Sequence, residues 1–598
     1  MIAIKRIFLK ISKRLYILKH LINLCKIGSQ GNITKFIFLI IISLLEGISD
    51  TLPVLIVVPF ITLISKPEKI WNTTLAKQLS NLSFINQPSD LLLPSFLIFT
   101  SVILINIFLK LFTINFSNFV KASFGHKISK LAFEKVIYSN YEFNISNSST
   151  KIIDDFYVSI GACLANIDSF LDAMRSFFTL SLIIISLFII NRDITFLIFI
   201  VCSLTYFSTS FVKNNILSKN GRILKVTVKK QTDIIQESWG YKKNIILENN
   251  QKSFLKKYSY FNQKYLFAKA KVNSAVTKPK FVIEGSFILI IGSIAFFLKS
   301  SYNYDPIPLL GGIALGLQKL LPNVNGIFQI YSSMVARHER SKDIENLIKK
   351  TPQDLTSTKE IENKGFVFKK LELKNVSYKY PSTKKLIISN GNLTIKNGES
   401  VGIIGRTGSG KSTLINLIMA LMKPSEGCLE INGINITDSC NEDTLIKYRK
   451  SISHVPQTIF LNNVTILENI AFGEKILEID YDKVIKACKA AKIYDFIKNA
   501  EKGLYSTVGE RGVKISGGQL QRIALARALY QDKKILILDE ATSALDNQTE
   551  KEVINSIKKY DPELTIISIA HRLSTLYDYD RILKVINGKI YNENDPSL

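Results

Sequence analysis

Long apolar runs alternate with polar stretches through the first 340 residues of the chain. Six of the runs are long enough to cross a bilayer as helices, because about 20 residues span its hydrocarbon layer. A tight turn of Asn191, Arg192 and Asp193 separates the third run from the fourth. The pattern predicts a six-helix, all-α transmembrane domain over residues 36–340. The six runs cover residues 36–64, 91–119, 174–191, 193–212, 281–299 and 307–335.

The polar segments that follow the second and fourth runs also have a helical pattern. A helix longer than about 20 residues extends beyond the hydrocarbon layer. We therefore expect several of these helices to continue into the cytoplasm.

The pattern changes after Lys342. Residues 341–365 are polar and are expected to form a linker. Beyond them, short β-rich runs alternate with helical stretches, which is typical of a mostly parallel sheet covered by helices. We therefore expect an α/β domain over residues 366–598. Its β-rich runs include SVGIIG at 400–405, KILILD at 534–539 and LTIISIA at 564–570.

The composition supports the membrane interpretation. Hydrophobic residues make up 47% of the chain, and its net charge is +28. The positive charge is concentrated in residues 1–35, with eight Lys or Arg and no acid, and in residues 213–280, with sixteen against three acids. Both blocks flank apolar runs, so the positive-inside rule explains them without nucleic acid as a partner. The rule also places both termini in the cytoplasm.

The basic N-terminal segment, residues 1–35, lacks the uninterrupted apolar stretch of a signal peptide. We expect it to form an amphipathic helix that lies on the cytoplasmic membrane surface. The six cysteines are scattered, without CxxC or Cys/His metal spacing, so reduced and unpaired thiols are expected.

The sequence GRTGSGKS at 405–412 fits the phosphate-binding loop G-x-x-x-x-G-K-[ST], between an expected strand and an expected helix. Its glycines let backbone N–H groups surround phosphate oxygens, and Lys411 reaches the β- and γ-phosphates. Ser412 offers its hydroxyl to Mg²⁺. The alternative is a glycine-rich turn before a helix, without a ligand. The expected ATP-binding residues here are Gly405, Arg406, Thr407, Gly408, Ser409, Gly410, Lys411, Ser412 and Thr413.

Two acids follow the strand ILILD. Asp539 ends this strand, where a carboxylate can hold Mg²⁺ beside the phosphate loop. Glu540 comes next and can polarise the water that attacks the γ-phosphate. The alternative for each is an ordinary acid that faces solvent at the end of a strand.

The most diagnostic stretch is KISGGQLQRIALARAL at 514–529. The backbone amides at Ser516, Gly517 and Gly518 can form a second anion site at a helix N-terminus. Taken alone, this stretch is more simply a helix N-cap with flexible glycines. Together with the phosphate-binding loop, it resembles the signature of the ATP-binding cassette (ABC) family, which extends to Gln519. Ile515 departs from the family's usual Leu, a change from one apolar residue to another.

Further motifs resemble that family in its own order along the chain. Gln457, in HVPQTIF, matches a glutamine that contacts Mg²⁺ and water, and Tyr380, in VSYKYP, matches the aromatic residue that stacks on adenine. His571, in IAHR, matches a histidine near the γ-phosphate. The alternatives for Tyr380 and His571 are packing and an ordinary polar contact. TVGERG at 507–512 and SALD at 543–546, with Asp546, complete the set.

The resemblance implies an ATP hydrolase coupled to transport, with ATP and Mg²⁺ as cofactors. In this family, ATP lies between the phosphate-binding loop of one nucleotide domain and the signature of another. This sequence contains one of each, so a second copy of the chain, or a homologous half-transporter, is expected as partner. A homodimer is the simplest arrangement, because every active-site position is intact. ATP would close the dimer and hydrolysis would reopen it.

The order of the domains resembles the exporter branch of the family. Turns near residues 141–150 and 236–247 look like the coupling helices that dock on the ATPase. Trp239 is then a docking anchor or, alternatively, a core residue.

The membrane half resembles bacterial flippases for lipid-linked oligosaccharides, which implies the bacterial inner membrane and a lipid-linked glycan as cargo. The pyrophosphate of such a cargo needs cationic partners, and Lys110 and Lys319 lie deep in the second and sixth runs. The alternative is that each lysine pairs with an acid inside the bundle. The matching segments are PFITLIS at 59–65, FVIEGSF at 281–287 and LQKLLPNVNGIFQIYSS at 317–333.

Other functions also fit the sequence. A multidrug, lipid or peptide exporter would share these motifs. A protein of another class, a membrane-anchored ATPase that regulates a partner without transport, is less favoured because every catalytic position is present.

Two acids, Glu46 and Asp50, lie one helical turn apart in the first run and share a helix face. A charge at the bilayer centre costs at least about 2.5 kcal/mol, so it needs a partner. Lys110 lies at a similar depth in the second run, and we predict that it pairs with one of the two acids. Lys319 then becomes the better candidate for contact with cargo.

Overall fold

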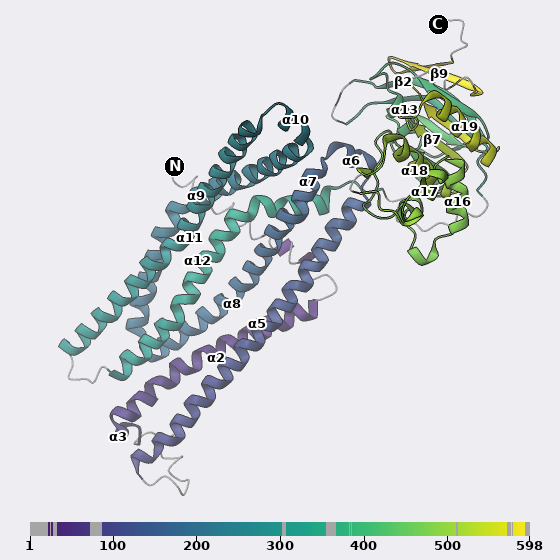
Figure 1. Ribbon diagram of the computed structural model, residues 1–598. Coiled ribbons are helices and arrows are strands. Elements are labelled where there is room, and N and C mark those ends of the chain that lie inside the picture. Colours follow the sequence, from purple (N-terminus) through teal and green to yellow (C-terminus); the bar gives the residue numbers. More distant parts are fainter. Residues whose placement is uncertain are drawn as a thin grey trace. The chain divides into compact units, whose positions relative to one another are not determined.

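The computed structural model divides into two compact units (Figure 1). The membrane unit contains Met1–Ser139 and Phe143–Pro352, and the ATPase unit contains Asn140–Glu142 and Gln353–Leu598. The structure describes residues 19, 22–23, 26–27, 33–71, 87–301, 307–354, 366–381, 383, 385–509, 512–570, 576 and 578–592.

Among the described residues, six long helices build the membrane unit, and each matches one of the expected spans to within a residue at its ends or extends beyond it (Figure 1). In the described part of the chain, three helical segments are long and apolar enough to cross a membrane: Ile33–Ser65, Leu92–Ile137 and Ser149–Ile190. The six are α2 (Ile33–Ser65), α5 (Leu92–Ile137), α8 (Ile160–Ile190), α9 (Arg192–Gly240), α11 (Gln251–Ser301) and α12 (Ile307–Lys350). Short elements between them are α3 (Pro67–Trp71), η1 (Pro88–Leu91), α6 (Tyr141–Ser146), α7 (Ser149–Asp154), η2 (Asp155–Ser159) and α10 (Lys242–Leu247).

The helices of this unit form two packed groups. Helices α2, α5, α8 and α12 pack together, and α9 pairs with α11 while both also contact α12. Apolar side chains cover much of the outer surface, as Leu93 and Phe108 of α5 are 70% and 68% exposed. A hydrocarbon environment accounts for such outward apolar side chains, because lipid tails are as apolar as they are.

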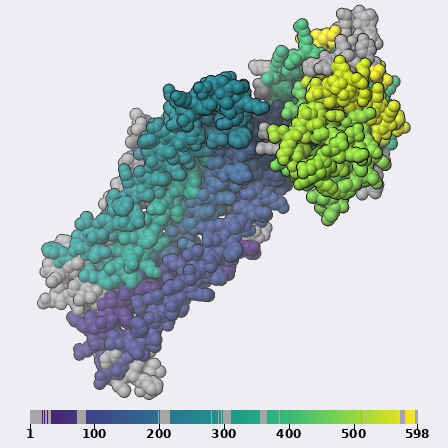
Figure 2. Space-filling view, viewed as in Figure 1, coloured from purple at the N-terminus to yellow at the C-terminus, as the bar shows by residue number. Residues whose placement is uncertain are grey.

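Two helices continue well beyond the expected spans. Helix α11 has 51 residues and α9 has 49, more than twice the length that spans hydrocarbon. Short helix α10 connects them and forms the tip of a hairpin, which lies at the surface in Figure 2. Trp239 beside this tip is 79% exposed, so the alternative of a core position for Trp239 is wrong.

The last long helix differs from the sequence-based expectation. Residues 341–350, expected within a linker, form the final turns of α12. The reason is a buried stripe at helical spacing, since Ile344 and Leu347 pack in a core with Phe124 and Ile128 of α5. Polar residues between these positions give the segment its linker-like composition.

The ATPase unit is built on a six-stranded sheet in the order β10–β9–β3–β8–β7–β6. Strand β3 pairs in parallel with β8 and β9, and β7 pairs in parallel with β6 and β8, which confirms the expected mostly parallel sheet. The strands are β3 (Ser400–Ile404), β6 (Ile452–Val455), β7 (Ile535–Asp539), β8 (Thr565–Ile569), β9 (Arg581–Ile586) and β10 (Lys589–Asn592). A second, antiparallel sheet has the order β2–β1–β4–β5, from β1 (Lys370–Tyr378), β2 (Ile388–Lys396), β4 (Glu426–Ile431) and β5 (Ile434–Asn435).

Two separate hydrophobic cores hold this unit together. One contains α13 (Lys411–Ile418) and the antiparallel sheet, and the other contains α16 (Tyr481–Ala490) and α18 (Gly517–Tyr530). The phosphate-binding loop and the signature therefore belong to different lobes of the unit. The remaining helices are α14 (Glu442–Lys450), α15 (Ile466–Ile470), α17 (Tyr494–Asn499) and α19 (Asn547–Tyr560), with 3₁₀ turns η4 (Ser439–Asn441), η5 (Ile476–Glu478) and η6 (Gly503–Tyr505).

Candidate nucleotide site and membrane cavity

The phosphate-binding loop connects β3, which ends at Ile404, to α13, which begins at Lys411. Gly405 has a φ angle of 155°, and a Cβ atom there would lie 2.5 Å from the carbonyl oxygen of Val585. Gly408 and Gly410 have φ angles of 79° and 110°. Glycine is required at these positions because other residues rarely adopt this backbone conformation.

Lys411 is buried at the start of α13, and its ammonium group folds back over the loop. Its Nζ atom donates to the carbonyl oxygens of Gly405 at 2.8 Å and Arg406 at 3.2 Å. Hydrogen bonds from an ammonium group to neutral carbonyl oxygens are weaker than those to a charged phosphate oxygen. The lysine is thus held beside the place where the loop would receive phosphate oxygens.

Asp539 and Glu540 lie at the C-terminal end of β7. Burial raises the pKa of Asp539, Glu540 adds to the rise, and Lys411 opposes it. One carboxylate oxygen of Asp539, Oδ1, is buried without a hydrogen-bond partner among the described residues. Carboxylate and hydroxyl oxygens are the ligands that Mg²⁺ prefers, so this orphaned oxygen, with the hydroxyl of Ser412 on α13, fits a magnesium site.

The structure joins two residues that lie 83 positions apart in the sequence. The Nε2 atom of Gln457 donates to Oε2 of Glu540 at 2.6 Å. Glu540 has a φ angle of 52°, which is unusual for a residue other than glycine, Asn or Asp. Such backbone strain is found at active sites, where it directs a side chain toward its target.

On the expected adenine side, the hydroxyl groups of Tyr380 and Thr413 lie 3.0 Å apart. The Tyr380 ring packs edge-on against Tyr378, with 5.2 Å between ring centroids. Tyr378 is buried, and its hydroxyl donates to Oε1 of Glu142 at 2.9 Å. Tyr378 therefore supports the ring that is predicted to stack on adenine, a role that the sequence does not signal.

The signature begins α18 with a capping box. The hydroxyl of Ser516 accepts from the backbone N–H of Gln519, whose side chain in turn accepts from the backbone N–H of Ser516. Gly517 and Gly518 form the first turn. The N-cap expected as the simpler interpretation is therefore present. It occupies the backbone N–H groups of Ser516 and Gln519, so an anion would contact those of Gly517 and Gly518.

The motif SALD is held by a residue that sequence reasoning did not single out. Gln521, inside the signature helix, donates to the hydroxyl of Ser543 at 3.2 Å and accepts from the backbone N–H of Ala544 at 3.0 Å. Asp546 caps α19. Its carboxylate accepts a hydrogen bond from the hydroxyl of Thr549, which holds the pKa of Asp546 below its usual range. Its predicted nucleotide contact stays a prediction. His571 and part of TVGERG lie outside the described residues.

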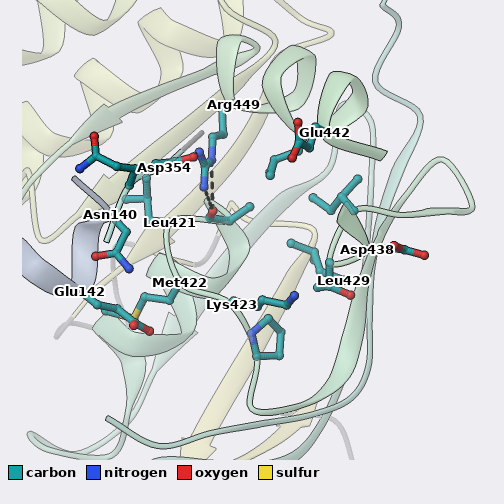
Figure 3. Close-up of a pocket in the computed structure, with 16 residues that line it drawn as sticks. Asn140, Glu142, Asp354, Leu421, Met422, Lys423, Leu429, Asp438, Glu442 and Arg449 are labelled. Carbon is teal, nitrogen blue, oxygen red and sulfur yellow. Dashed lines mark hydrogen bonds and ion pairs between the residues drawn. The ribbon is translucent and has the colours of Figure 1, made fainter. Parts of the chain in front are cut away.

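A hollow of about 350 Å³ lies elsewhere in the ATPase unit (Figure 3). Arg449 lines it and pairs with Asp354, with 2.6 Å between Nη1 and Oδ2. The same guanidinium donates through Nε to the carbonyl oxygen of Ala420, just beyond α13. The segment that follows α12 is thereby tied to the C-terminal end of the phosphate-loop helix.

The membrane unit encloses a cavity of about 570 Å³. Five charged side chains line it, namely those of Glu46, Asp50, Lys110, Arg175 and Lys319. Its wall also contains Asn106, Ser176, Thr179, Gln318 and Asn323, so it is polar in a unit whose outer surface is apolar. Intramembrane cavities with charged walls mark functional sites by default.

The expected pairing of Lys110 is confirmed. Its ammonium nitrogen lies 3.5 Å from Oδ2 of Asp50. Lys319, expected to remain available for cargo, also pairs with Asp50, at 2.7 Å from Oδ1. Asn106 adds a hydrogen bond to the same oxygen at 3.1 Å. The structural alternative, in which each lysine pairs with an acid, is therefore what the structure shows.

Glu46 has a different partner from the one considered from the sequence. Its Oε2 atom lies 3.8 Å from Nε of Arg175, on α8, and forms no hydrogen bond among the described residues. Arg175 was not named from the sequence as a partner for the two acids. Like Lys110, it is a charged residue within an apolar run, and this pattern could have identified it.

We predict that Asp50→Asn destabilises the fold, because it leaves two lysines in the bundle without a carboxylate. The loss in unfolding free energy should be about 3–5 kcal/mol, the range for removing one partner of a buried ion pair. Thermal unfolding of the purified chain in detergent measures it. Asp172→Asn is the matched control, since its pair with Lys121 at 2.9 Å lies outside this cavity and Asp172 is 40% exposed. A smaller loss for Asp50→Asn than for Asp172→Asn would contradict the prediction.

Comparisons with known proteins find similarity to ABC transporters. Residues 388–543 match the family model described as ABC transporter. The ATP-dependent lipid A-core flippase of Pasteurella multocida (strain Pm70) is 35% identical over 329 residues, 54% of each chain. ABC transporter B family member 2 of Dictyostelium discoideum is 44% identical over 221 residues, which are 37% of this chain and 15% of that protein. The chain spans about half the length of the lipid A-core flippase from Pasteurella.

A solved structure shows the same fold. The structure of a bacterial Atm1-family ABC exporter with ATP bound superposes with a TM-score of 0.74 and covers 93% of this chain and 94% of that one. The two sequences are 21% identical, so this likeness concerns the fold. The helical membrane unit and the α/β ATPase unit are those expected from the sequence. Residues 388–543 thus form an ABC transporter domain, and the chain as a whole has the fold of an ABC exporter.

Proposed function

We propose that this protein is an ATP-driven exporter that moves an amphipathic substrate, a lipid-linked oligosaccharide or another lipid-linked glycan, across the bacterial inner membrane. The observation that carries the proposal is the charged cavity inside an exporter-type helical unit. The hydrogen bond between Gln457 and Glu540 in the ATPase unit supports it. The relatives named ATP-dependent lipid A-core flippase support a lipid cargo.

The loop residues 405–413 bind the phosphates of ATP in this proposal. Backbone N–H groups of the loop and the N-terminus of α13 stabilise negative charge, and Lys411 exchanges its carbonyl partners for phosphate oxygens. Tyr380 stacks on the adenine ring. Mg²⁺, when bound by Ser412, Asp539 and Gln457, would neutralise charge on the β- and γ-phosphates.

Glu540 is the proposed general base. It accepts a proton from the attacking water, and Gln457, already bonded to it at 2.6 Å, orients that water. His571 contacts the γ-phosphate in the same proposal. Gln521 positions the loop 543–546, which includes Asp546, beside the partner's nucleotide.

The second copy of the chain completes each ATP site. The phosphate-binding loop and the signature residues 516–519 belong to different lobes, which supports contact of the signature with a nucleotide on the partner. A homodimer is the proposed assembly, and a pair with a homologous half-transporter is the alternative. ATP binding then favours the closed dimer, and hydrolysis reopens it, as a population shift between two states.

The α9–α11 hairpin supports docking on a partner. Tyr241 and Leu247 at its tip are 60% and 85% exposed, like Trp239 nearby. Exposed aromatic and apolar groups of this kind mark interaction sites. We assign them to contact with the ATPase unit of the second copy.

Lys110 and Lys319 are the proposed contacts for the phosphate of the cargo. Each ammonium group has three N–H donors, so it can hold Asp50 and still donate to a second oxygen. The Lys110 side chain is 45% exposed and that of Lys319 is 27% exposed, whereas Asp50 is buried behind them. The lysines thus face the cavity while the carboxylate holds them in place.

The basic segments support a cytoplasmic location for the ATPase unit and both termini. Residues 213–280, with sixteen cations against three acids, contain the α9–α11 hairpin extension. The basic segment 1–35 would then lie on the cytoplasmic membrane surface.

Two other functions remain as alternatives. A multidrug, lipid or peptide exporter would share the ATP site and differ in the cavity. A regulatory ATPase without transport would hydrolyse ATP in the membrane and move none of the candidate substrates.

We predict that the reconstituted chain transfers a fluorescent lipid-linked oligosaccharide between leaflets when ATP is present. Glu540→Gln should reduce ATP hydrolysis and transfer by at least about 100-fold, the lower end of the range for loss of a general base, while ATP binding is retained. Quenching of the label in the outer leaflet of proteoliposomes measures transfer. Glu552→Gln, an exposed acid on α19, is the matched control and should behave as wild type.

Failure of the wild-type chain to move this probe, a labelled lipid or a peptide, while it hydrolyses ATP, would contradict the exporter proposal and support the regulatory ATPase. Transfer of the peptide or a drug without the glycolipid would overturn the proposed cargo alone.

The composite ATP site is tested by combining two inactive chains. Lys411→Ala removes the loop lysine and Ser516→Arg blocks the signature, so each variant alone should be inactive. If ATP binds between two copies, a mixed dimer contains one intact site and one site with both defects. Coexpression in equal amounts should therefore restore about one quarter of wild-type hydrolysis, by random pairing of subunits. Hydrolysis that stays at the level of the single variants would contradict the shared site.

A further inference from the structure

The two carboxylates of the membrane cavity are held very differently. Asp50 has three partners, Lys110, Lys319 and Asn106, and both of its oxygens are used. Glu46 is 2% exposed, its Oε2 atom has no hydrogen bond among the described residues, and the nearest cation, Arg175, is 3.8 Å away. The structure therefore supports the ionised form of Asp50 well and that of Glu46 poorly.

The charges around Glu46 come from every helix that lines the cavity. Asp50 lies one turn along α2, Lys110 is on α5, Arg175 on α8 and Lys319 on α12. With both acids ionised, three cations and two carboxylates give the cavity a formal charge of +1. Protonation of Glu46 changes this charge to +2, whereas protonation of Asp50 would break two ion pairs.

Charge balance links this difference to the cargo. An uncompensated charge inside a membrane protein costs several kcal/mol, so a bound headgroup should neutralise the cavity. A headgroup with one negative charge, such as a phosphodiester, balances the cavity when Glu46 is ionised. A headgroup with two negative charges, such as a pyrophosphate diester, balances it when Glu46 carries a proton.

We propose that Glu46 adjusts the charge of the cavity to its cargo, so that a doubly charged lipid headgroup enters together with one proton and a singly charged headgroup enters without one. This inference rests on the proposed function, since it concerns the headgroup of an amphipathic cargo. The proton comes from water and is bound at the Glu46 carboxylate, and no other bond forms or breaks. Glu46 is thus a specificity-determining residue, and Asp50 is a positioning residue for the two lysines.

Linkage gives the sign of the pH dependence. Because binding of the doubly charged headgroup takes up a proton, its affinity rises as pH falls, by up to about tenfold per pH unit. Binding of the singly charged headgroup neither releases nor takes up a proton, so its affinity does not change with pH. Glu46→Gln fixes the cavity at +2, which should remove the pH dependence.

The test measures binding to the full-length chain in nanodiscs of phosphatidylcholine, between about pH 5.5 and about pH 8. Histidine side chains also titrate within this range. The probes are short-chain cytidine diphosphate diacylglycerol, a pyrophosphate diester with two charges, and short-chain phosphatidylglycerol, a phosphodiester with one. Neither probe changes its own phosphate charge in this range. Calorimetric titration in two buffers of different ionisation enthalpy counts the protons taken up.

We expect uptake of one proton with the pyrophosphate lipid, none with phosphatidylglycerol, and none with either lipid for Glu46→Gln. Glu284→Gln, a carboxylate of α11 that pairs with Lys280 outside this cavity, is the matched control and should keep the wild-type uptake. A variant that merely disturbs folding would lose binding of both lipids.

Binding of the pyrophosphate lipid without proton uptake, or uptake that persists in Glu46→Gln, would overturn the inference. So would failure of both probes to bind the wild-type chain. None of these results depends on ATP or on transport, so a chain that takes up the proton but moves no cargo would contradict the exporter proposal and leave this inference standing.

Discussion

The carboxylate of Asp50 is the contact on which the membrane unit depends most. It binds Lys110 from α5 and Lys319 from α12 and lies on α2, so one buried group joins three helices. Charged groups inside a bilayer must be paired, and a carboxylate with two ammonium partners satisfies that requirement while it leaves a positive excess. The same arrangement therefore holds the bundle together and leaves its cavity with more cationic than anionic side chains.

In the ATPase unit, a few side chains likewise come together around the phosphate-binding loop. Lys411, Asp539 and Glu540 come to one edge of a parallel sheet because β3 and β7 both flank β8 and end at the same side. Gln457, two residues after the end of β6, donates a hydrogen bond to Glu540. The orphaned oxygen of Asp539 and the strained backbone of Glu540 are features that ligands and chemistry would explain, since packing alone does not require them.

Much of the fold could be predicted because its signals are local. Apolar runs long enough to span a bilayer gave the helices, and the loop after Ile404 and the acid at Asp539 follow from strand and motif patterns. Contacts across the chain could not be predicted in this way. The pairing of Arg175 with Glu46, the bond of Gln521 to Ser543 and the tie between Arg449 and Asp354 depend on tertiary packing. Polar residues in the final turns of α12 mask a narrow buried stripe, so the composition of this segment predicts a linker instead of a helix.

In the proposed function, binding of cargo in the charged cavity increases ATP hydrolysis at the nucleotide site. Stimulation of ATP hydrolysis by a lipid-linked oligosaccharide, measured on reconstituted wild type and on Lys319→Met, tests it most directly. The account predicts that the lipid increases hydrolysis by the wild type, and that Lys319→Met retains basal hydrolysis but loses most of this increase. Equal stimulation of both proteins would contradict the account.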